Sequence, residues 1–191
     1  HERGKAHKES SLVIQDVKQL THKFLLDYLW KERKINLDIA RKYCQEVHYT
    51  NNDKPYYAIG FKNDKGGFAL RNKFVKMCTS PNHWTTINQG NNSVSIFEGF
   101  LDFLSAMTYY QREPKHTVVV LNSVSFINMI KLEGDIQYWG DNDKAGDSAF
   151  QKIINCCGYC VDERHRYAGC KDFNEFLVQC EGNKKVRLLS N

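Results

Sequence analysis

The chain has 191 residues, of which 41% are hydrophobic and 26% charged, a composition typical of a soluble globular protein with one full core or two small ones. No apolar run approaches 18 residues, which excludes a membrane-spanning helix, and the start of the chain lacks the charged and then apolar pattern of a secretory signal. Residues 1–90 hold 16 Lys and Arg against 9 Asp and Glu, net +7, whereas residues 91–191 hold 11 against 13, net −2. This distribution suits a protein that binds a polyphosphate with its first half. The alternative is that the basic surface is merely solvated.

The chain begins at His1 instead of Met, which suggests a fragment or a processed product. Residues 1–9 are polar and basic without periodicity, as in a linker. From Val13 to Trp30, apolar residues recur at spacings of three and four, which predicts an amphipathic helix. Asn36 is expected to cap a second, shorter helix.

The next part of the chain is expected to form strands, so that residues 10–90 make up a smaller, basic α+β subdomain. The predicted strands cover residues 47–49, 56–61 and 67–71. Alternation along the last strand would place Arg71 and Lys73 on one face, with Lys76 just beyond it. These three residues are candidates for binding nucleic-acid phosphates, and a solvated strand face explains them equally well.

From residue 91 onward, strand-like and helical segments alternate, which predicts an α/β domain over residues 91–191 with a mostly parallel sheet flanked by helices. The predicted strands cover residues 94–97, 117–121, 136–139 and 158–161. The predicted helices run from 100 to about 110, from 123 to about 131 and from 144 to about 156.

Two of these strands lead directly into acidic residues. Glu98 follows one, and Gly99 leaves the backbone free to turn into the helix that carries Asp102; Asp141 and Asp143 follow the other. Ligands bind at the carboxyl ends of strands in an open α/β sheet. Since two carboxylates at about 4 Å repel by roughly 4 kcal/mol at an effective dielectric near 20, acids gathered there predict a bound Mg²⁺ or Mn²⁺.

A third acidic segment, Lys171-Asp172, stands before a short helix near the end of the chain. Glu98-Gly99 with Asp102, then Asp141-Asn142-Asp143 with Gly146, then Lys171-Asp172 resemble the motifs of the Toprim domain. That domain is shared by bacterial primases, type IA and type II topoisomerases and some nucleases and recombination proteins. The alternative is a strand-end charge followed by an ordinary polar turn.

The first half resembles the catalytic core of bacterial primases, because a helix, Gly60-Phe61, Gly66-Gly67 and a basic strand precede the Toprim motifs. The resemblance is strongest to the zinc-ribbon-plus-Toprim primase-like proteins of Bacteroides mobile elements, without their zinc ribbon. It implies a cytoplasmic, primase-like nucleotidyltransferase that makes short primers from ribonucleoside triphosphates on a single-stranded DNA template. A replicative helicase is a candidate partner, and no membrane is involved.

The resemblance also implies roles for individual residues. Glu98 and Asp102 would be catalytic, the divalent ion would be held by Glu98, Asp141, Asp143 and Asp172, and the nucleotide would contact Lys144 and Lys171. Primases often carry a further acid where this chain has Asn174, and this substitution argues against a further metal position, because a neutral amide oxygen binds magnesium less well than a carboxylate. A Toprim nuclease and a non-catalytic nucleic-acid-binding module of a mobile-element replication protein are the alternative functions.

The seven cysteines indicate reduced thiols in a cytoplasmic setting, because their number is odd and the chain is large enough for an ordinary core. Cys157, Cys160, His165 and Cys170 have the spacing of a zinc knuckle. A strand through residues 158–161 would spread the first two along an extended segment. The set is therefore predicted to be structural, and no zinc is expected in this fragment.

Overall fold

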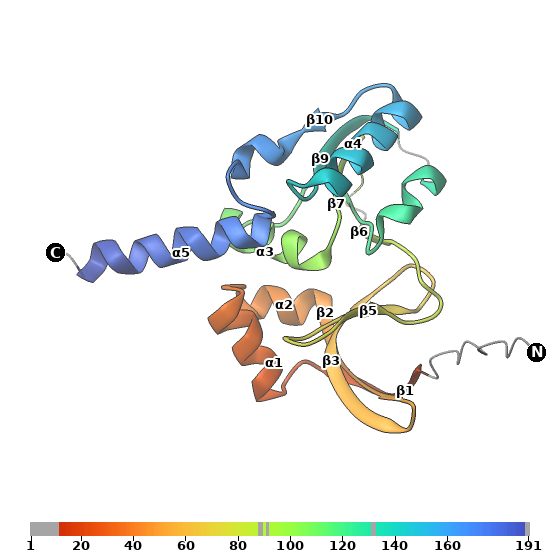
Figure 1. Ribbon diagram of the computed structural model, residues 1–191, viewed down its shortest axis with the longest axis vertical. Coiled ribbons are helices and arrows are strands. Elements are labelled where there is room, and N and C mark those ends of the chain that lie inside the picture. Colours follow the sequence, from red (N-terminus) through yellow and green to blue (C-terminus); the bar gives the residue numbers. More distant parts are fainter. Residues whose placement is uncertain (1–11, 88–89, 91, 131–132, 190–191) are drawn as a thin grey trace, which may run out of the picture.

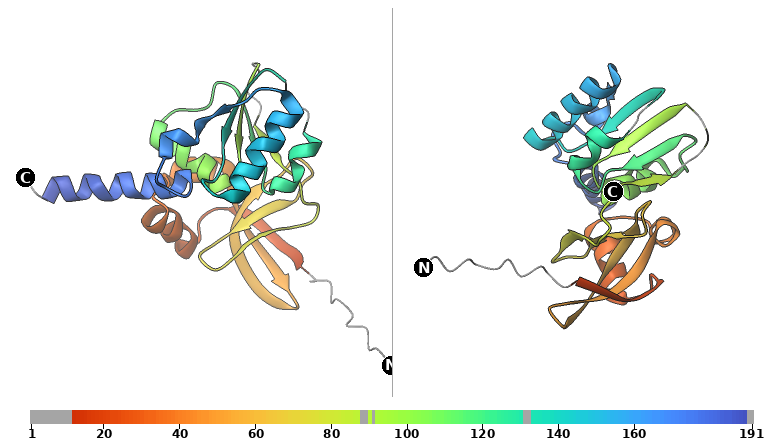
Figure 2. Two further views of the ribbon diagram at one scale, coloured as in Figure 1. Left: turned by 45° about the horizontal axis from the view of Figure 1, so that its top comes forward. Right: turned by 90° about the vertical axis from the view of Figure 1, so that its right-hand side faces the viewer.

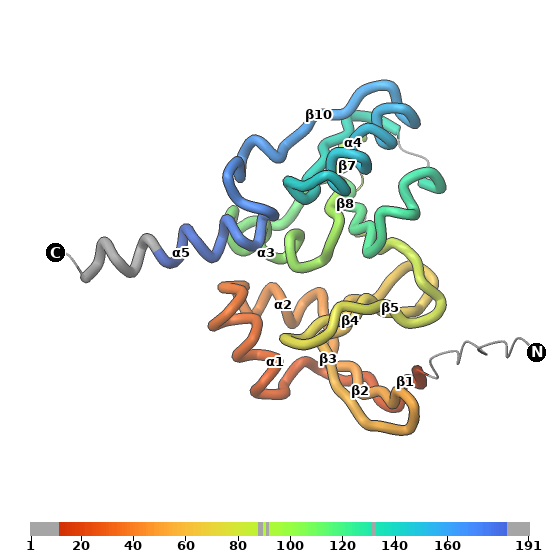
Figure 3. Tube along the Cα trace, viewed as in Figure 1, coloured from red at the N-terminus to blue at the C-terminus, as the bar shows by residue number. Residues whose placement is uncertain are grey.

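The computed structural model describes residues 12–87, 90, 92–130 and 133–189. Two five-stranded sheets make up its two halves, which lie one above the other in Figure 1 and in the right-hand view of Figure 2. The chain passes from the lower half to the upper half after β5 (Lys76–Cys78), as the trace in Figure 3 shows. The predicted linker at residues 1–9 lies outside the described residues.

The first sheet has the strand order β1-β2-β3-β4-β5, and each neighbouring pair is antiparallel. Its other strands are β1 (Leu12–Gln19), β2 (Cys44–Asn51), β3 (Lys54–Lys62) and β4 (Phe68–Arg71). The strands predicted at residues 47–49, 56–61 and 67–71 are therefore confirmed, as parts of β2, β3 and β4. Three short helical segments accompany them: α1 (Lys23–Asp27), the π-helical turn η1 (Tyr28–Glu32) and α2 (Leu37–Tyr43). Asn36 caps α2 as predicted, since its Oδ1 accepts the N–H groups of Asp38 and Ile39 at 2.8 and 3.3 Å.

The prediction of one helix from Val13 to Trp30 is wrong, because the first part of that segment is β1. Val13 and Val17 are β-branched residues that favour strands, and they pair with Thr50 and Val47 of β2. Glu46 of β2 then ends the strand, since its Oε2 accepts the backbone N–H groups of Thr21 and His22 at 3.1 and 2.7 Å. The apolar residues with helical spacing form helical structure only after that turn, in α1 and η1.

The second sheet has the strand order β10-β9-β7-β8-β6. Its strands are β6 (Thr85–Ile87), β7 (Ser93–Phe97), β8 (Thr117–Val120), β9 (Asp135–Trp139) and β10 (Val161–Asp162). β7 is central, and it pairs in parallel with both β8 and β9, whereas only β6 is antiparallel to its neighbour. The predicted mostly parallel sheet is confirmed. The strand predicted at residues 158–161 is shorter and begins at Val161.

Helical segments connect the strands from β7 to β10, as the alternation predicted, and two more follow β10. They are α3 (Phe100–Tyr110), the 3-10 helix η2 (Val124–Met129), α4 (Lys144–Cys157), the 3-10 helix η3 (Glu163–Tyr167) and α5 (Phe173–Leu189). The helix expected at 123–131 is the shorter η2, with Ser123 as its cap. None of the helices in the described part of the chain has the length and apolar character needed to cross a membrane.

One hydrophobic cluster joins the two halves. It includes Leu25 and Leu29 from the first half and Phe100 and Leu104 from α3, all buried. Phe61 of β3 stacks on Phe100 with ring centroids 5.2 Å apart. Because this core is shared, the faces that the halves turn toward each other are held in a fixed relation. The division proposed at residue 90 stays a proposal, and β6, at 85–87, already belongs to the second sheet.

Candidate active site

A cavity of about 850 Å³ lies between the two halves, at the carboxyl ends of β7 and β9. Five acids of the second half line it: Glu98, Asp102, Asp141, Asp143 and Asp172. Four cations also line it, of which three come from the first half: Arg33, Arg71, Lys76 and Lys171. The structure thus brings all five predicted acids to one cavity and faces them with positive charge.

Glu98 is held at the end of β7 by two hydrogen bonds to one of its oxygens. Its Oε1 accepts the backbone N–H of Asp141 at 3.1 Å and the hydroxyl of Tyr138, a fully buried residue of β9. The pKa of Tyr138 is raised by its burial and by the neighbouring Glu98 carboxylate. The hydroxyl therefore stays protonated and donates a hydrogen bond to Glu98. Gly140 makes room for this contact, because a Cβ there would lie 2.0 Å from the Tyr138 hydroxyl oxygen. The second oxygen of Glu98 remains for a ligand.

The pKa of Asp141 is unusually high for an aspartate. Burial raises its pKa to about 6, and the negative charges of Glu98 and Asp172 add to this effect, while Lys171 opposes it. The carboxylate is 21% exposed, so water screens this repulsion only in part. Ionised Asp141 is therefore destabilised in the absence of a compensating cation.

Asp143 has a second role as the N-cap of α4. Its Oδ1 accepts the N–H groups of Ala145 and Gly146 at 2.9 and 3.0 Å, and these bonds lower its pKa. Its Oδ2 lies 3.9 Å from Nζ of Lys171, which is also 4.0 Å from Oδ2 of Asp141. The Lys171 ammonium thus stands between the two aspartates, at a place where positive charge is favoured.

Asn142 joins two of the predicted motifs. Its backbone N–H donates to the carbonyl of Lys171 at 2.6 Å, and its side-chain Nδ2 donates to the carbonyl of Cys170 at 2.8 Å. Asp172 in turn accepts the N–H of Glu175 at 2.7 Å and so caps α5. The asparagine between the two aspartates is therefore a clamp that brings Asp172 to the site.

Asp102 and Asn174 connect the acids to the first half of the chain. Oδ1 of Asp102 accepts the backbone N–H of Asn174 at 3.1 Å, and burial, with Asp172 and Asp141 nearby, raises the pKa of Asp102 well above its ordinary value. The Asn174 side chain is buried; its Oδ1 accepts from Nη1 of Arg33 at 3.0 Å, and its Nδ2 donates to the Arg33 carbonyl at 2.9 Å. The amide oxygen of Asn174 is thus already engaged by Arg33.

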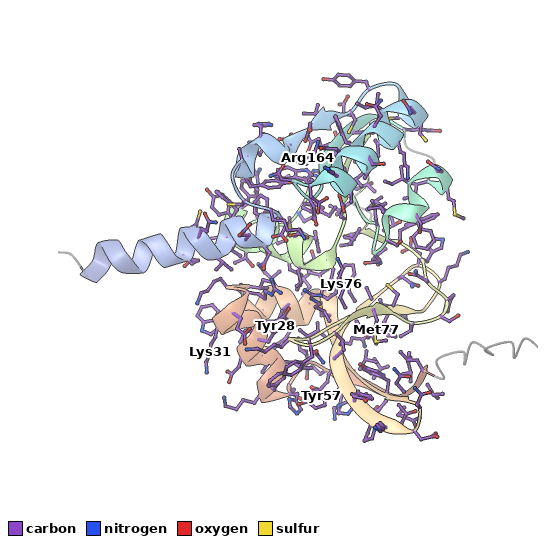
Figure 4. All side chains as sticks on the ribbon, viewed as in Figure 1. Tyr28, Lys31, Tyr57, Lys76, Met77 and Arg164 are labelled. Carbon is purple, nitrogen blue, oxygen red and sulfur yellow. The ribbon has the colours of Figure 1, made fainter. Side chains whose placement is uncertain are left out.

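The structure separates the cations that the sequence grouped. Arg71 and Lys76 pair across β4 and β5 and line the cavity, and Nε of Arg71 is buried without a hydrogen-bond partner among the described residues. Lys76 is labelled in Figure 4 where the first half faces the second. Lys73 does not lie beside them, since β4 ends at Arg71 and Lys73 instead pairs with Glu32 at 3.0 Å. Lys144 is exposed at the start of α4 and is not among the lining residues.

Sequence reasoning did not assign a site role to Arg33 or Tyr138. Arg33 follows the π-helical turn, whose end could not be located from the apolar spacing. Tyr138 has the signal of a buried strand residue two positions before Gly140, which by itself indicates only packing.

The donors present fit a hard divalent cation, because carboxylate oxygens are the ligands that Mg²⁺ and Mn²⁺ prefer. Within the described residues, no group of three or more His, Cys, Asp or Glu side chains converges closely enough to hold an ion. Mg²⁺ commonly takes only one or two protein carboxylates and completes its shell with water and substrate phosphates. Asp141 and Asp143 provide such a pair.

The four residues with zinc-knuckle spacing lie on four different segments between α4 and α5. Cys157 ends α4 and its thiol donates to the Ile153 carbonyl at 3.0 Å, whereas Cys160 precedes β10. His165 is in η3, where its Nδ1 lies 2.8 Å from the Asp162 carbonyl. That the set is structural stays a prediction, tested by elemental analysis.

Comparisons with known proteins agree with this geometry. Residues 95–177 match the family model described as Toprim-like, and residues 14–80 match a family described only as a domain of unknown function. No curated protein matches the chain.

Two similar solved structures come from bacteriophage T7. One is the primase fragment of the primase-helicase protein, with 18% identity and a TM-score of 0.55 over 82% of this chain and 71% of that one. The other is a complex of the phage's lagging-strand DNA polymerase with primase domains bound to an RNA/DNA hybrid and dTTP, with 15% identity and a TM-score of 0.53 over 84% of this chain and 89% of that one. At these identities the likeness concerns the fold. The family match shows that residues 95–177 are similar to Toprim-like domains, and the two structures show that the chain shares its fold with T7 primase domains.

Proposed function

We propose that this protein is a primase-like nucleotidyltransferase that synthesises short primers on single-stranded DNA with a divalent metal. The observation that carries the proposal is the cavity between the halves, which has five carboxylates on one side and Arg33, Arg71 and Lys76 on the other. A nucleoside triphosphate needs both: cations for its phosphates, and carboxylates for the metal that accompanies it. The fold shared with the T7 primase fragment supports this choice over other Toprim activities.

In this proposal Asp141 and Asp143 hold Mg²⁺ or Mn²⁺, with Asp172 nearby. A bound divalent ion would supply charge neutralisation of the phosphates and polarise the attacking and leaving oxygens. Glu98 is positioned by Tyr138 and by the Asp141 N–H, with one oxygen left to bind the ion or to take the proton of the primer hydroxyl.

The cations divide between two tasks. Arg71, with its unpaired buried Nε, and Lys76 hold phosphates in the cavity. Lys171, which lies 4.0 and 3.9 Å from Asp141 and Asp143, would contact the triphosphate if these aspartates held a cation, and Lys144 is the other candidate for nucleotide contact. Ribonucleoside triphosphates as substrates, a replicative helicase as partner, a mobile-element origin and a cytoplasmic location belong to the same proposal.

The test is incubation of the chain with labelled ribonucleotides, single-stranded DNA and Mg²⁺, with products resolved on a sequencing gel for extension and cleavage. Extension is expected, absent in Asp141→Asn and reduced at least about 100-fold in Glu98→Gln, the scale of one acid-base group. Asp135→Asn is the matched control, because Asp135 is exposed at the opposite end of β9. Cleavage without nucleotide would support a nuclease instead, and no reaction in any arm would support a binding module.

A further inference from the structure

The hairpin between β4 and β5 exposes an aromatic ring beside the cavity. Phe74 is 79% exposed, and it lies three residues from Arg71 and two from Lys76, both of which line the cavity. Three residues of chain span at most about 10 Å. The backbone of Phe74 therefore lies within about 10 Å of two residues that line the proposed active site, on the side formed by the first half.

Phe74 is exposed but not loosely held. Oδ1 of Asn72 accepts the N–H groups of Phe74 and Val75 at 2.8 and 3.0 Å, and Nδ2 of Asn72 donates to the Tyr57 carbonyl at 2.9 Å. The Phe74 ring lies nearly parallel to that of Phe24 in α1, at 10° with centroids 6.0 Å apart. At this separation the two rings are offset, and with 79% of its surface exposed the Phe74 ring remains open to solvent.

The aromatic rings continue across the sheet from this point. Phe24 meets Tyr57 edge to face at 6.2 Å, and Tyr57 stacks on His22 at 4.1 Å. Tyr57 is opposite His48 in the β2 and β3 pairing, and it is labelled in Figure 4 on the part of the first half away from the second. The rings form a strip that leads away from the cavity.

Positive charge accompanies the strip. Lys73, next to Phe74, pairs with Glu32 at 3.0 Å, but both side chains are about half exposed, at 50% and 46%. Such a surface pair contributes little, so Lys73 can exchange Glu32 for a phosphate. The whole first 90 residues carry net +7, from 16 Lys and Arg against 9 Asp and Glu.

We infer that Phe74 is a stacking platform for a base of the single-stranded DNA template as it enters the cavity, with Lys73 contacting the adjoining phosphate. An open aromatic face flanked by cations is what single-stranded nucleic acid needs, since every base has a face that can stack and every nucleotide has a charge. The inference rests on the proposed function for the identity of the strand, but binding by Phe74 needs neither metal nor reaction. It assigns the path of the template to the hairpin tip, and leaves Arg71 and Lys76 to the reacting phosphates.

The test measures binding of fluorescent oligothymidylate by anisotropy, in chelator and without nucleotide. Phe74→Ala should weaken binding about 5- to 150-fold, the range expected for loss of one stacked base, and Phe74→Trp should restore it. The slope of affinity against salt should not change, because no phosphate contact is removed. Tyr159→Ala is the matched control, as Tyr159 is another exposed ring, 70% accessible, but in the second half.

A matched oligonucleotide with abasic positions sharpens the result. If Phe74 stacks on a base, Phe74→Ala should have no effect on the abasic strand, which keeps the same charge. Equal losses on both strands, an unchanged affinity for oligothymidylate, or no recovery with Trp would overturn the inference. Because these binding assays contain neither metal nor nucleotide, they do not depend on catalysis. If the wild type makes no primers but Phe74→Ala still weakens binding of oligothymidylate, only the proposed function is refuted.

Discussion

Replacing Asp141 by Asn should stabilise the folded protein when no metal is present. The pKa of Asp141 rises from 3.8 to about 6 on folding, through burial first and then through Glu98 and Asp172. A difference of about 2 units at 1.36 kcal/mol each makes the ionised carboxylate cost about 3 kcal/mol in the folded state. The substitution removes this cost and keeps the size of the side chain.

The effect has a defined pH dependence. A carboxyl whose folded pKa is raised loses its proton at a higher pH in the folded state than in the unfolded chain. The free energy of unfolding therefore falls as pH rises from about 4 to about 6 and stays reduced above pH 6. The advantage of Asp141→Asn should therefore be near zero at pH 4 and about 3 kcal/mol at pH 7.5.

Urea unfolding in chelator at these two pH values measures the difference directly. Asp135→Asn, at the exposed start of the same strand, should show no such pH dependence. Adding Mg²⁺ with nucleotide should then stabilise the wild type more than the variant, since only the wild type keeps the full ligand pair. A variant that is less stable than the wild type at pH 7.5 in chelator, or a difference that is equal at both pH values, would refute the electrostatic reasoning.

Other predictions concern stability and composition. Asn174→Asp should lower stability by about 1 to 3 kcal/mol in denaturant titrations, because Nδ2 no longer donates to the Arg33 carbonyl; increased stability with added Mg²⁺ would show a new metal ligand instead. Although burial alone would raise the pKa of Glu46, hydrogen bonds from His48 and from the backbone before α1 lower it to about 2, against 4.5 when unfolded. Its contribution, about 3 kcal/mol by the same conversion, should be complete above pH 4.5 and disappear as pH falls through about 2, and Glu46→Gln should show no such loss between these values. Elemental analysis should find no zinc; one zinc per chain, lost in Cys160→Ser, would contradict that prediction.

The acidic motifs could be located from the sequence because each follows a short apolar strand, and parallel strands bring their carboxyl ends to one edge. Glu98, Asp141 and Asp143 needed only that local signal. Lys171 and Asp172 reach the site through Asn142, whose hydrogen bonds to the Cys170 and Lys171 carbonyls span 28 and 29 residues and have no local pattern. The shared motif order was the only indication that they belong to it.

The first half was harder to predict, because its structure depends on partners distant in sequence. The apolar spacing of residues 13–19 favours a helix, whereas their β-branched side chains favour a strand. Pairing with β2 makes this segment a strand. Lys73 was grouped with Arg71 on the assumption that the strand continues, but Asn72 turns the chain one residue later. Arg33 lies in the cavity through its bonds to Asn174, 141 residues away.

Calorimetric titration with Mn²⁺ tests the central claim most directly, with nucleotide present and with the wild type, Asp141→Asn, Asp143→Asn and Glu98→Gln compared. Binding is expected in the wild type, loss in both aspartate variants, and largely retained affinity in Glu98→Gln, because the role proposed for Glu98 lies mainly in the phosphoryl-transfer step. If the wild type binds no ion, or if Asp141→Asn binds as tightly as the wild type, the acids of the cavity are not a metal site and the primase-like mechanism is contradicted.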